Sequence, residues 1–409
     1  MALFKDKLKF LDILRSNIKK KKVVIDETKE NFGFEKMKQL RDVDRDYIQG
    51  IPFRLQSSDG KKIVFKVTPV ETRYEKNKNP VYIENIILKE LTETFVKKYN
   101  IPNFLYYLGT LKISCKSPAL RTKYFSILNN EGCIRSTCNV LISEYIDKGS
   151  LKEYADQRNL SLNVWKSIIF QVVFSIHAMQ EKYKLMHNDL HHGNILIDKI
   201  DENGYLSYNI QNTKYYVKHN GIIPKLFDYE FAMSFKNNIK GMYENVLIND
   251  KKEYMNYYNE GSDLHCFFDS LLDFELPQEL EDWIRSKYDP RILIEHYESE
   301  KLSSSSYKTD SDDEERGNNE SEKSTSCEKT IENLLNVTDF SENSYSSSSS
   351  SKSISKGDFT SHRRLLKGIE KIIDLPTPLS ILTDPFFSSY MEKPKKYDTY
   401  KEHNIDILF

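Results

Sequence analysis

A polar loop between strongly apolar segments restricts the fold of this chain more than any other feature of its sequence. The loop carries Asp189 and Asn194, five positions apart. Residues 160–183 before it place apolar side chains at helical spacing, and a short strand is predicted directly after it. A second short strand, at residues 222–227, ends immediately before Asp228. This order of helix, loop, strand and carboxylate predicts a site where several elements meet.

Three histidines also lie in this loop, so a metal site is an alternative interpretation. His187, His191 and His192 stand close to Asp189 in the sequence. Zinc sites commonly use cysteines, or two histidines one helical turn apart in a His-Glu-x-x-His pattern. The loop has neither feature, since it contains no cysteine and lies between a helix and a strand. The sequence therefore favours chemistry carried by the carboxylates and Asn194.

Phosphoryl transfer is a reaction that needs this set of side chains. One carboxylate orients the attacking hydroxyl group and accepts its proton, while an asparagine and a second carboxylate hold Mg²⁺ against the phosphates of ATP. Asp189 fits the first role, and Asn194 and Asp228 fit the second. Lys66 lies in a predicted strand, and Glu84 lies in a predicted helix that follows it.

These residues, in this order, resemble the protein kinase superfamily. The segment Asp189-Leu190-His191 and the tyrosine after Asp228 are most similar to haspin-type kinases and to serine/threonine kinases of large DNA viruses. The resemblance implies an α+β, bilobal protein-kinase-like fold. Its N-lobe is expected to be small and β-rich with one prominent helix, αC, and its C-lobe to be larger and mostly helical.

The resemblance implies catalytic roles for the residues of the loop. Asp189 is expected to be the catalytic base, and Asn194 and Asp228 are expected to bind the metal. His191 stands where the family has a lysine, and it is expected to donate a hydrogen bond to the γ-phosphate. Asp263, at the start of a later helix, is expected to brace the backbone of the loop.

The same resemblance implies a nucleotide site for ATP and Mg²⁺. Lys66 is expected to contact the α- and β-phosphates, with Glu84 from helix αC as its ion-pair partner. Backbone groups of Glu144 and Ile146 are expected to hydrogen-bond adenine at the hinge between the lobes. Gly50 lies where the family has its glycine-rich loop.

The sequence departs from the family pattern at several points. The glycine-rich loop is reduced to Gly50, and Asn188 replaces the arginine that pairs with a phosphorylated activation loop, so activity is not expected to need that phosphate. Tyr229 and Glu230 stand in place of Phe and Gly after the metal-binding Asp. Residues 205–217 alternate between polar and apolar side chains, which predicts an inserted hairpin.

Shifts in composition divide the chain into five expected segments. An amphipathic helix at the N-terminus is expected to dock on the next domain, although a membrane-surface helix and a nuclear address are alternatives. A later serine-rich and acidic block has too little apolar surface to order itself, and is either a spacer or a platform for phosphorylation. The segments are an N-terminal helical extension (1–45), the kinase N-lobe (46–146), the first part of the C-lobe (147–300), the disordered insertion (301–357), and the C-terminal end of the C-lobe with a tail (358–409).

Charge and hydropathy exclude some classes of function. Lys and Arg number 60 and Asp and Glu 61, so the net charge of −1 argues against nucleic acid as the main ligand. No apolar run has the length of a membrane span, and no secretory signal is evident at the N-terminus. The five scattered cysteines suit a reducing compartment better than a disulfide framework. We therefore expect a cytoplasmic protein, in the host cytoplasm if it is viral, or packaged in the virion.

Three functions are compatible with this set of residues. The first is an ATP- and Mg²⁺-dependent protein serine/threonine kinase, which has a protein substrate and ATP as its partners. A bias toward Lys, Asn, Ile and Tyr, consistent with an AT-rich genome, points to a large DNA virus as its source. The second is a pseudokinase that binds a partner without turnover, which the missing glycines and Glu230 suggest. The third is a small-molecule kinase, since Asp-Leu-His also occurs in that class. The sequence leaves the protein substrate and the oligomeric state open.

Overall fold

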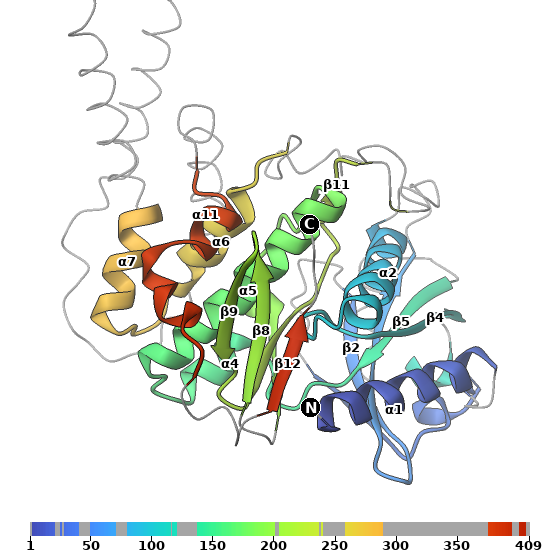
Figure 1. Cartoon of the computed structure of the whole chain (residues 1–409). Coiled ribbons are helices and arrows are strands. Elements are labelled where there is room, and N and C mark those ends of the chain that lie inside the picture. Colours follow the sequence, from blue (N-terminus) through green and yellow to red (C-terminus); the bar gives the residue numbers. More distant parts are fainter. Residues whose placement is uncertain are drawn as a thin grey trace, which may run out of the picture.

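The computed structural model describes residues 2–20, 25–26, 28–40, 50–70, 80–115, 117–120, 137–200, 204–236, 239, 258–288, 375–394 and 401–405. Within them, a strand-rich N-terminal lobe lies beside a mostly helical C-terminal lobe (Figure 1). This arrangement confirms the predicted mixed α+β, bilobal kinase-like fold. The predicted serine-rich insertion, 301–357, lies outside the described residues.

A five-stranded antiparallel sheet, in the order β1-β2-β3-β5-β4, builds the N-terminal lobe. Alternate residues of β2 are buried, as a strand with one face on a core requires. The turn from β2 to β3 contains Asp59 and Gly60, and Gly60 has a φ of +79°, which glycine adopts without steric cost. The strands are β1 (Lys36–Gln39), β2 (Ile51–Gln56), β3 (Lys62–Pro69), β4 (Tyr107–Ser114) and β5 (Thr137–Glu144).

Two helical segments pack on this sheet. The first, α1 (Ala2–Lys19), contacts β4 and buries Leu11, so the predicted N-terminal helix does dock on the lobe (Figure 1). The second begins with a proline and runs through α2 (Pro80–Leu91) into the π-helical turn η2 (Thr92–Lys98). Residues 36–39 were assigned to a helical extension by sequence, which was wrong for them, because they form β1 and pair with β2.

The C-terminal lobe is organised around one apolar helix, α5 (Leu162–Tyr183). It ends at Lys184, which has a left-handed φ of 46°. Among the described residues, α5 is the helix long and apolar enough to cross a membrane, but 78% of its apolar window is buried inside the protein. Around it lie α4 (Leu151–Asp156), α6 (Ser262–Leu271), α7 (Gln278–Tyr288), α11 (Pro378–Leu382) and the 3-10 helix η6 (Pro385–Met391).

Short antiparallel strand pairs carry the loops of the C-terminal lobe. The polar loop identified in the sequence joins β6 to β7 and contains a short 3-10 turn. Because β7 pairs with β10, the residues that precede β7 and follow β10 lie next to each other. The pairs are β6 (Leu185–Met186) with β11 (Met233–Ser234) and β7 (Ile195–Lys199) with β10 (Ile222–Leu226); the 3-10 turn is η4 (His192–Asn194).

The predicted inserted hairpin is confirmed as β8 (Gly204–Ile210) and β9 (Thr213–Lys218). Gln211 and Asn212 both have positive φ at the turn, as two-residue hairpin loops require. A third strand, β12 (Lys401–Ile405), runs parallel to β8 and lies beside it in Figure 1. The sequence predicted only a tail here, and the strand was missed.

Two cysteines differ from the sequence expectation. Cys115 and Cys138 form a disulfide whose Cα atoms are 5.2 Å apart. The pairing of β4 with β5 sets Ile113 opposite Cys138. Cys115, which directly follows β4, therefore lies within reach of Cys138. The composition indicated a chain without a disulfide framework, so this bond is a correction. Its partners are 23 residues apart in sequence, and only the sheet register brings them together.

Candidate active site

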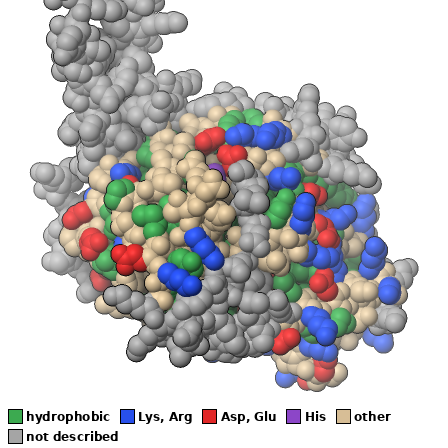
Figure 2. All heavy atoms as spheres, in the orientation of Figure 1, with side chains coloured by type: hydrophobic (Ala, Val, Ile, Leu, Met, Phe, Trp, Pro, Cys, Tyr) green, Lys and Arg blue, Asp and Glu red, His purple; other side chains and the backbone are tan. Residues whose placement is uncertain are grey.

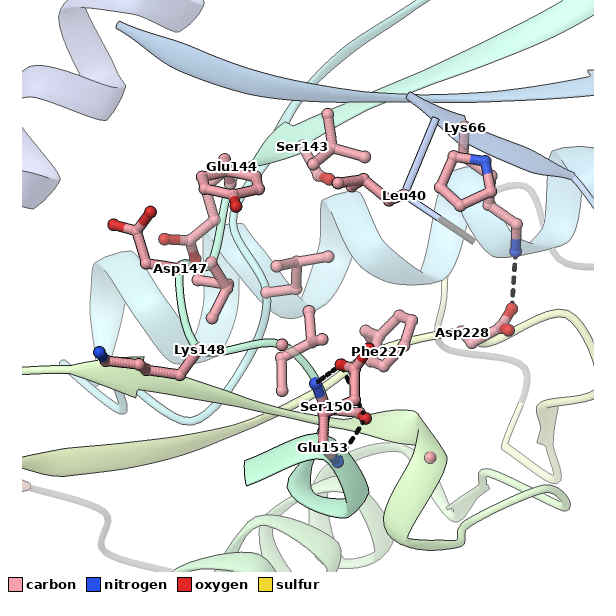
Figure 3. Close-up of a pocket in the computed structure, with 18 of the residues that line it drawn as sticks. Leu40, Lys66, Ser143, Glu144, Asp147, Lys148, Ser150, Glu153, Phe227 and Asp228 are labelled. Carbon is pink, nitrogen blue, oxygen red and sulfur yellow. Dashed lines mark hydrogen bonds and ion pairs between the residues drawn. The ribbon is translucent and has the colours of Figure 1, made fainter. Parts of the chain in front are cut away.

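A cavity of about 790 Å³ separates the two lobes. Figure 3 shows Leu40, Lys66 and Ser143 on its N-terminal side, and Phe227 and Asp228 on the opposite side. Gly50, Glu84, Glu144 and Ile146, which the sequence analysis singled out, also line it. Asp189, His191 and Asn194 are not among the lining residues, but their neighbour Gly193 is.

Lys66 joins the two sides of the cavity. Its Nζ lies 2.9 Å and 3.0 Å from the two carboxylate oxygens of Glu84 and 2.6 Å from Oδ1 of Asp228 (Figure 3 shows the contact with Asp228). Burial on its own would lower the pKa of Lys66, but the carboxylates of Asp228, Glu84 and Glu230 outweigh burial and raise it above its usual value. Lys66 therefore stays charged, as a residue that contacts phosphate must.

Gly50 approaches this lysine closely. A Cβ atom at Gly50 would lie 2.7 Å from Cγ and 2.8 Å from Cε of Lys66, and would also collide with Thr68. Leu40 and Gly50 flank residues 41–49, which lie outside the described residues, at the end of the hairpin formed by β1 and β2. A side chain at Gly50 would therefore displace Lys66, and its predicted place in a glycine-rich loop stays a prediction.

Strand pairing places Asn194 beside Asp228. Ile195 is opposite Leu226, and the backbone N of Phe227 donates to the carbonyl O of Asn194 at 3.3 Å. Asp228 itself has a φ of +68°, a strained conformation for a non-glycine residue that is common at functional sites.

A second contact of Asn194 fixes Asp189. The amide Nδ2 of Asn194 donates to the Asp189 carboxylate Oδ2 at 3.0 Å and to the Asp189 carbonyl O at 2.8 Å. Asn194 thus contacts Asp189 through its side chain and Phe227, the residue before Asp228, through its backbone. The polar loop that carries Asp189 and Asn194 therefore lies next to the residue before Asp228, although Asp228 is 34 positions further along the chain than Asn194.

Asp263 braces the polar loop from α6. Its Oδ2 accepts a hydrogen bond from the backbone N of His187 at 2.7 Å, and its Oδ1 accepts one from Asn188 N at 2.8 Å. The carboxylate is 1% exposed, so these bonds are shielded from water. Tyr229 packs on the other side of the loop, with its ring 5.0 Å from that of His187. The predicted bracing by Asp263 is present.

The loop histidines have separate environments. His191 Nε2 is 3.9 Å from Oδ2 of Asp189, and its Nδ1 accepts a hydrogen bond from Gly193 N at 3.1 Å. His192 Nε2 lies 3.1 Å from Asp273, while His187 Nε2 donates to the carbonyl O of Phe227 at 2.9 Å. In the described part of the chain, no group of three or more His, Cys, Asp and Glu side chains is arranged to hold a metal.

Asn194 and Asp228 nevertheless have the chemistry that Mg²⁺ requires. Magnesium binds oxygen ligands, and it is commonly held by one or two protein groups together with waters and substrate phosphates. Asn194 engages its amide nitrogen with Asp189, so its Oδ1 is the atom suited to a cation. Asp228 supplies a carboxylate that lines the cavity next to Lys66. The residues therefore fit the ion that their pattern predicts.

Glu144 has a buried ionic role that sequence reasoning missed. The sequence predicts for Glu144 only backbone hydrogen bonds to adenine. Its carboxylate lies 2.7 Å from Lys225 Nζ on β10 and 3.0 Å from Lys7 Nζ on α1. Lys7 also lies 2.5 Å from Asp198 on β7. We call Lys7, Glu144, Asp198 and Lys225 the hinge cluster.

The signal available in the sequence for this cluster was Lys225 itself. It is a lysine inside an apolar strand, and a buried lysine needs a buried carboxylate partner.

The hinge cluster predicts an acid-sensitive contribution to stability. Burial alone would raise the pKa of Glu144, but Lys225 and Lys7 outweigh it and lower the pKa from 4.5 to about 2. Since the folded pKa lies below the unfolded value, ionised Glu144 stabilises the fold above pH 4.5, and this contribution is lost as the pH falls toward 2. The shift corresponds to about 3 kcal/mol, of which about 2 kcal/mol is expected to be lost by about pH 3.

Denaturant unfolding of the wild type and of Glu144→Gln at about pH 6 and about pH 3 measures this contribution. The wild type is expected to lose about 2 kcal/mol more free energy of unfolding than the variant, because glutamine does not titrate. Equal losses in the two proteins would show that Glu144 is not held ionised by the lysines.

These contacts lie within a fold of the protein kinase class. The lysine–glutamate pair, the asparagine that holds the loop aspartate, the aspartate after β10 and the bracing aspartate of α6 occur in the order and the positions of that class. A family model described as the haspin-like kinase domain matches residues 16–255, more than half of the chain. The chain belongs to this family.

Several curated proteins are similar to the chain. A protein of Acanthamoeba polyphaga mimivirus is 28% identical over 194 residues, which are 41% of this chain and 38% of the relative. A Dictyostelium discoideum protein is 29% identical over 141 residues, 33% of this chain and 11% of the relative. An Invertebrate iridescent virus 6 protein is 25% identical over 195 residues, 47% of this chain and 32% of the relative. Their names give serine/threonine-protein kinase as a provisional assignment, and the chain spans well under two thirds of the length of each.

Proposed function

We propose that the chain is an ATP- and Mg²⁺-dependent protein serine/threonine kinase, which transfers the γ-phosphate to a hydroxyl group of a protein. One observation carries the proposal, namely that Asn194 contacts both Asp189 and the residue before Asp228, while Lys66 bonds to Asp228 and Glu84. The names of the viral and Dictyostelium relatives support the choice of serine and threonine.

Each residue of the site has a separate role in phosphoryl transfer. Asp189 orients the incoming hydroxyl group and accepts its proton, and the Nδ2 of Asn194 holds its carboxylate in place. Lys66 neutralises charge on the α- and β-phosphates, while Glu84 keeps its ammonium group in the cavity. His191 lies near Asp189 and donates toward the γ-phosphate. Mg²⁺, when bound by Asn194 and Asp228, neutralises charge on the β- and γ-phosphates.

The active arrangement does not need a phosphorylated activation loop in this proposal. Asn188 occupies the position of the arginine that would read such a phosphate. Its Nδ2 donates to the carbonyl O of Phe231 at 3.2 Å, so it holds the segment after Asp228 directly. Asp263 fixes the backbone of the same residue. These two contacts supply locally the order that a phosphate supplies elsewhere.

The source and the place of action are part of the proposal. Relatives from two viruses support an origin in a large DNA virus, with action in the host cytoplasm or inside the virion. Figure 2 shows Lys and Arg side chains interspersed with Asp and Glu over the described residues of the face drawn. That mixed surface supports a protein as the substrate rather than nucleic acid as the main ligand.

A γ-phosphate transfer assay with acidic and basic proteins as acceptors tests the proposal. Transfer to serine or threonine that requires Mg²⁺ or Mn²⁺ is expected. Binding of ATP by the folded protein without transfer would support a pseudokinase instead. Transfer to choline or to aminoglycosides, but not to proteins, would support a small-molecule kinase.

Replacing Lys66 with methionine tests the charge at the centre of the cavity. The variant keeps the aliphatic stem but leaves Glu84 and Asp228 without their shared cation. We expect the transfer rate to fall about 100-fold, the effect of removing one preorganised charge from a transition state. Lys62→Met, on the same face of β3 and paired with the exposed Asp147, is the control and is expected to change the rate less than about twofold. Equal rates for the two variants would contradict the assignment of Lys66.

A further inference from the structure

The N-terminal helix reaches the hinge through one side chain. Glu144 Oε1 is already engaged, since it accepts hydrogen bonds from Lys225 Nζ at 2.7 Å and from the backbone N of Tyr106 at 2.9 Å. Its Oε2 is buried and is not engaged by Lys225 or by the backbone N of Tyr106. The cation that balances this oxygen is Lys7, at 3.0 Å. Lys7 therefore completes the environment of Glu144.

Charge balance makes Lys7 necessary to the hinge cluster. With Lys7, two ammonium groups face two carboxylates, and without it the cluster carries one excess negative charge. The side chains of Glu144 and Lys225 are each 1% exposed while that of Lys7 is 30% exposed, so water that replaces the ammonium group must enter from the Lys7 side. Glu144 would keep Lys225 on Oε1, but its Oε2 would lose its cation, and rehydration or protonation of that buried oxygen requires the chain around it to move.

Movement of Glu144 would change the wall of the cavity directly. Ser143, Glu144 and Ile146 line the cavity at the end of β5. The backbone N of Glu144 donates to the Tyr106 carbonyl O at 3.1 Å, while its side chain holds the Tyr106 N. The same residue thus joins the hinge cluster to the wall against which adenine would lie. Lys7 is not among the residues that line the cavity, and it acts only through Glu144.

The rest of α1 is anchored so that Lys7 is presented in one position. Arg15 lies 2.5 Å from Glu93 on η2, and Asp12 lies 3.4 Å from Lys97 on the same segment. Asp12 also accepts a hydrogen bond from the hydroxyl group of Tyr106 at 2.5 Å. The helix is therefore attached to the helical segment of the N-terminal lobe at one end and to the hinge at the other.

We propose that Lys7 is a positioning residue for adenine binding, which fixes the hinge backbone through the carboxylate of Glu144. α1 is then a working part of the nucleotide site, although none of its described side chains (residues 6–19) lines the cavity. The proposal rests on the proposed function, because it takes the cavity to bind adenine at the hinge. It assigns to α1 a role in nucleotide affinity rather than in the transfer step.

The test compares adenosine and ATP binding by calorimetry in Lys7→Met and in the wild type, under conditions where circular dichroism shows both to be folded. Since the hinge contacts only the adenine, we expect both ligands to bind about tenfold more weakly to the variant, with kcat changed less than about twofold. Lys7→Arg keeps the charge and is expected to restore most of the affinity. Lys9→Met, on the exposed face of α1, is the matched control and should bind as the wild type does.

A double-mutant cycle separates positioning from general stabilisation. In the Glu144→Gln background, Lys7→Met is expected to change adenosine affinity less than about twofold, because the carboxylate that needs Lys7 is gone. A Lys7→Met protein that melts at a lower temperature but binds adenosine normally would overturn the proposal and leave Lys7 a purely structural residue. A wild type that binds ATP without transferring phosphate would refute the proposed function alone, since the affinity ratio still decides the role of Lys7. A wild type that binds neither ligand would refute both.

Discussion

Replacing Asp189 with asparagine is expected to lower the rate of γ-phosphate transfer about 10³-fold, because the side chain can no longer accept the proton of the attacking hydroxyl group. The change is nearly isosteric, and Asn194 Nδ2 can still donate to the remaining carbonyl oxygen and to the backbone O of residue 189. ATP affinity is therefore expected to change less than about threefold, since Asp189 does not line the cavity. The loss should appear in kcat, measured with radiolabelled ATP and a protein acceptor.

The control for this experiment is Asp156→Asn at the end of α4. Asp156 is about half exposed and lies 3.9 Å from Lys152, a surface pair of little energetic weight. Its transfer rate is expected to match that of the wild type. Transfer by Asp189→Asn at more than about a tenth of the wild-type rate would mean that another group accepts the proton, and the assignment of Asp189 as the base would fail.

Asp263→Asn is expected to lower the free energy of unfolding by about 2–4 kcal/mol. The carboxylate accepts hydrogen bonds from the backbone N of His187 on one oxygen and of Asn188 on the other. An asparagine amide offers one acceptor, so its NH₂ group must face a buried N–H donor at one of the two positions. Bonds to a buried charged group contribute about 1.5–3 kcal/mol each, and an unsatisfied buried donor costs about 1–3 kcal/mol. Denaturant unfolding followed by circular dichroism measures the difference.

The same substitution should also impair transfer in the folded fraction, because the two backbone groups that it releases belong to the residues just before Asp189. Asp282→Asn on α7 is the matched control, since Asp282 is exposed and its side chain accepts from Gln278 at 2.9 Å. We expect it to change stability by less than about 0.5 kcal/mol. If Asp263→Asn is as stable as Asp282→Asn, the loop does not depend on this brace.

The side chains at the centre of the site could be predicted because their signals are local. Asp189 and Asn194 are five residues apart in one loop, and Asp228 directly follows a recognisable strand. Lys66 and Glu84 lie on one strand and one helix with clear periodicity, and their contact follows from the family order. The fold class followed from the same elements, because long apolar helices and alternating strands are the patterns that single sequences show best.

The features that were missed depend on tertiary pairing. The strands β1 and β12 are short and polar, so no apolar alternation marks them in the sequence. The partners in the hinge cluster come from four separate segments, and many surface lysines could have paired with Glu144. The disulfide depends on the register of β4 and β5. Each of these contacts depends on residues that are neighbours only in the folded structure, and a pattern along the sequence does not identify them.

The segments after residue 374 matter for how the protein is made. Phe387 and Tyr390 pack edge-to-face against Phe170 of α5, and β12 completes the small sheet with β8 (Figure 1). The central helix leaves the ribosome some two hundred residues before the aromatic groups that cover it. During translation the apolar face of α5 is exposed until these residues are made, and chaperones can bind such exposed surface. A chain that ends before residue 375 would therefore leave Phe170 without Phe387 and Tyr390, and such exposed apolar surface favours aggregation.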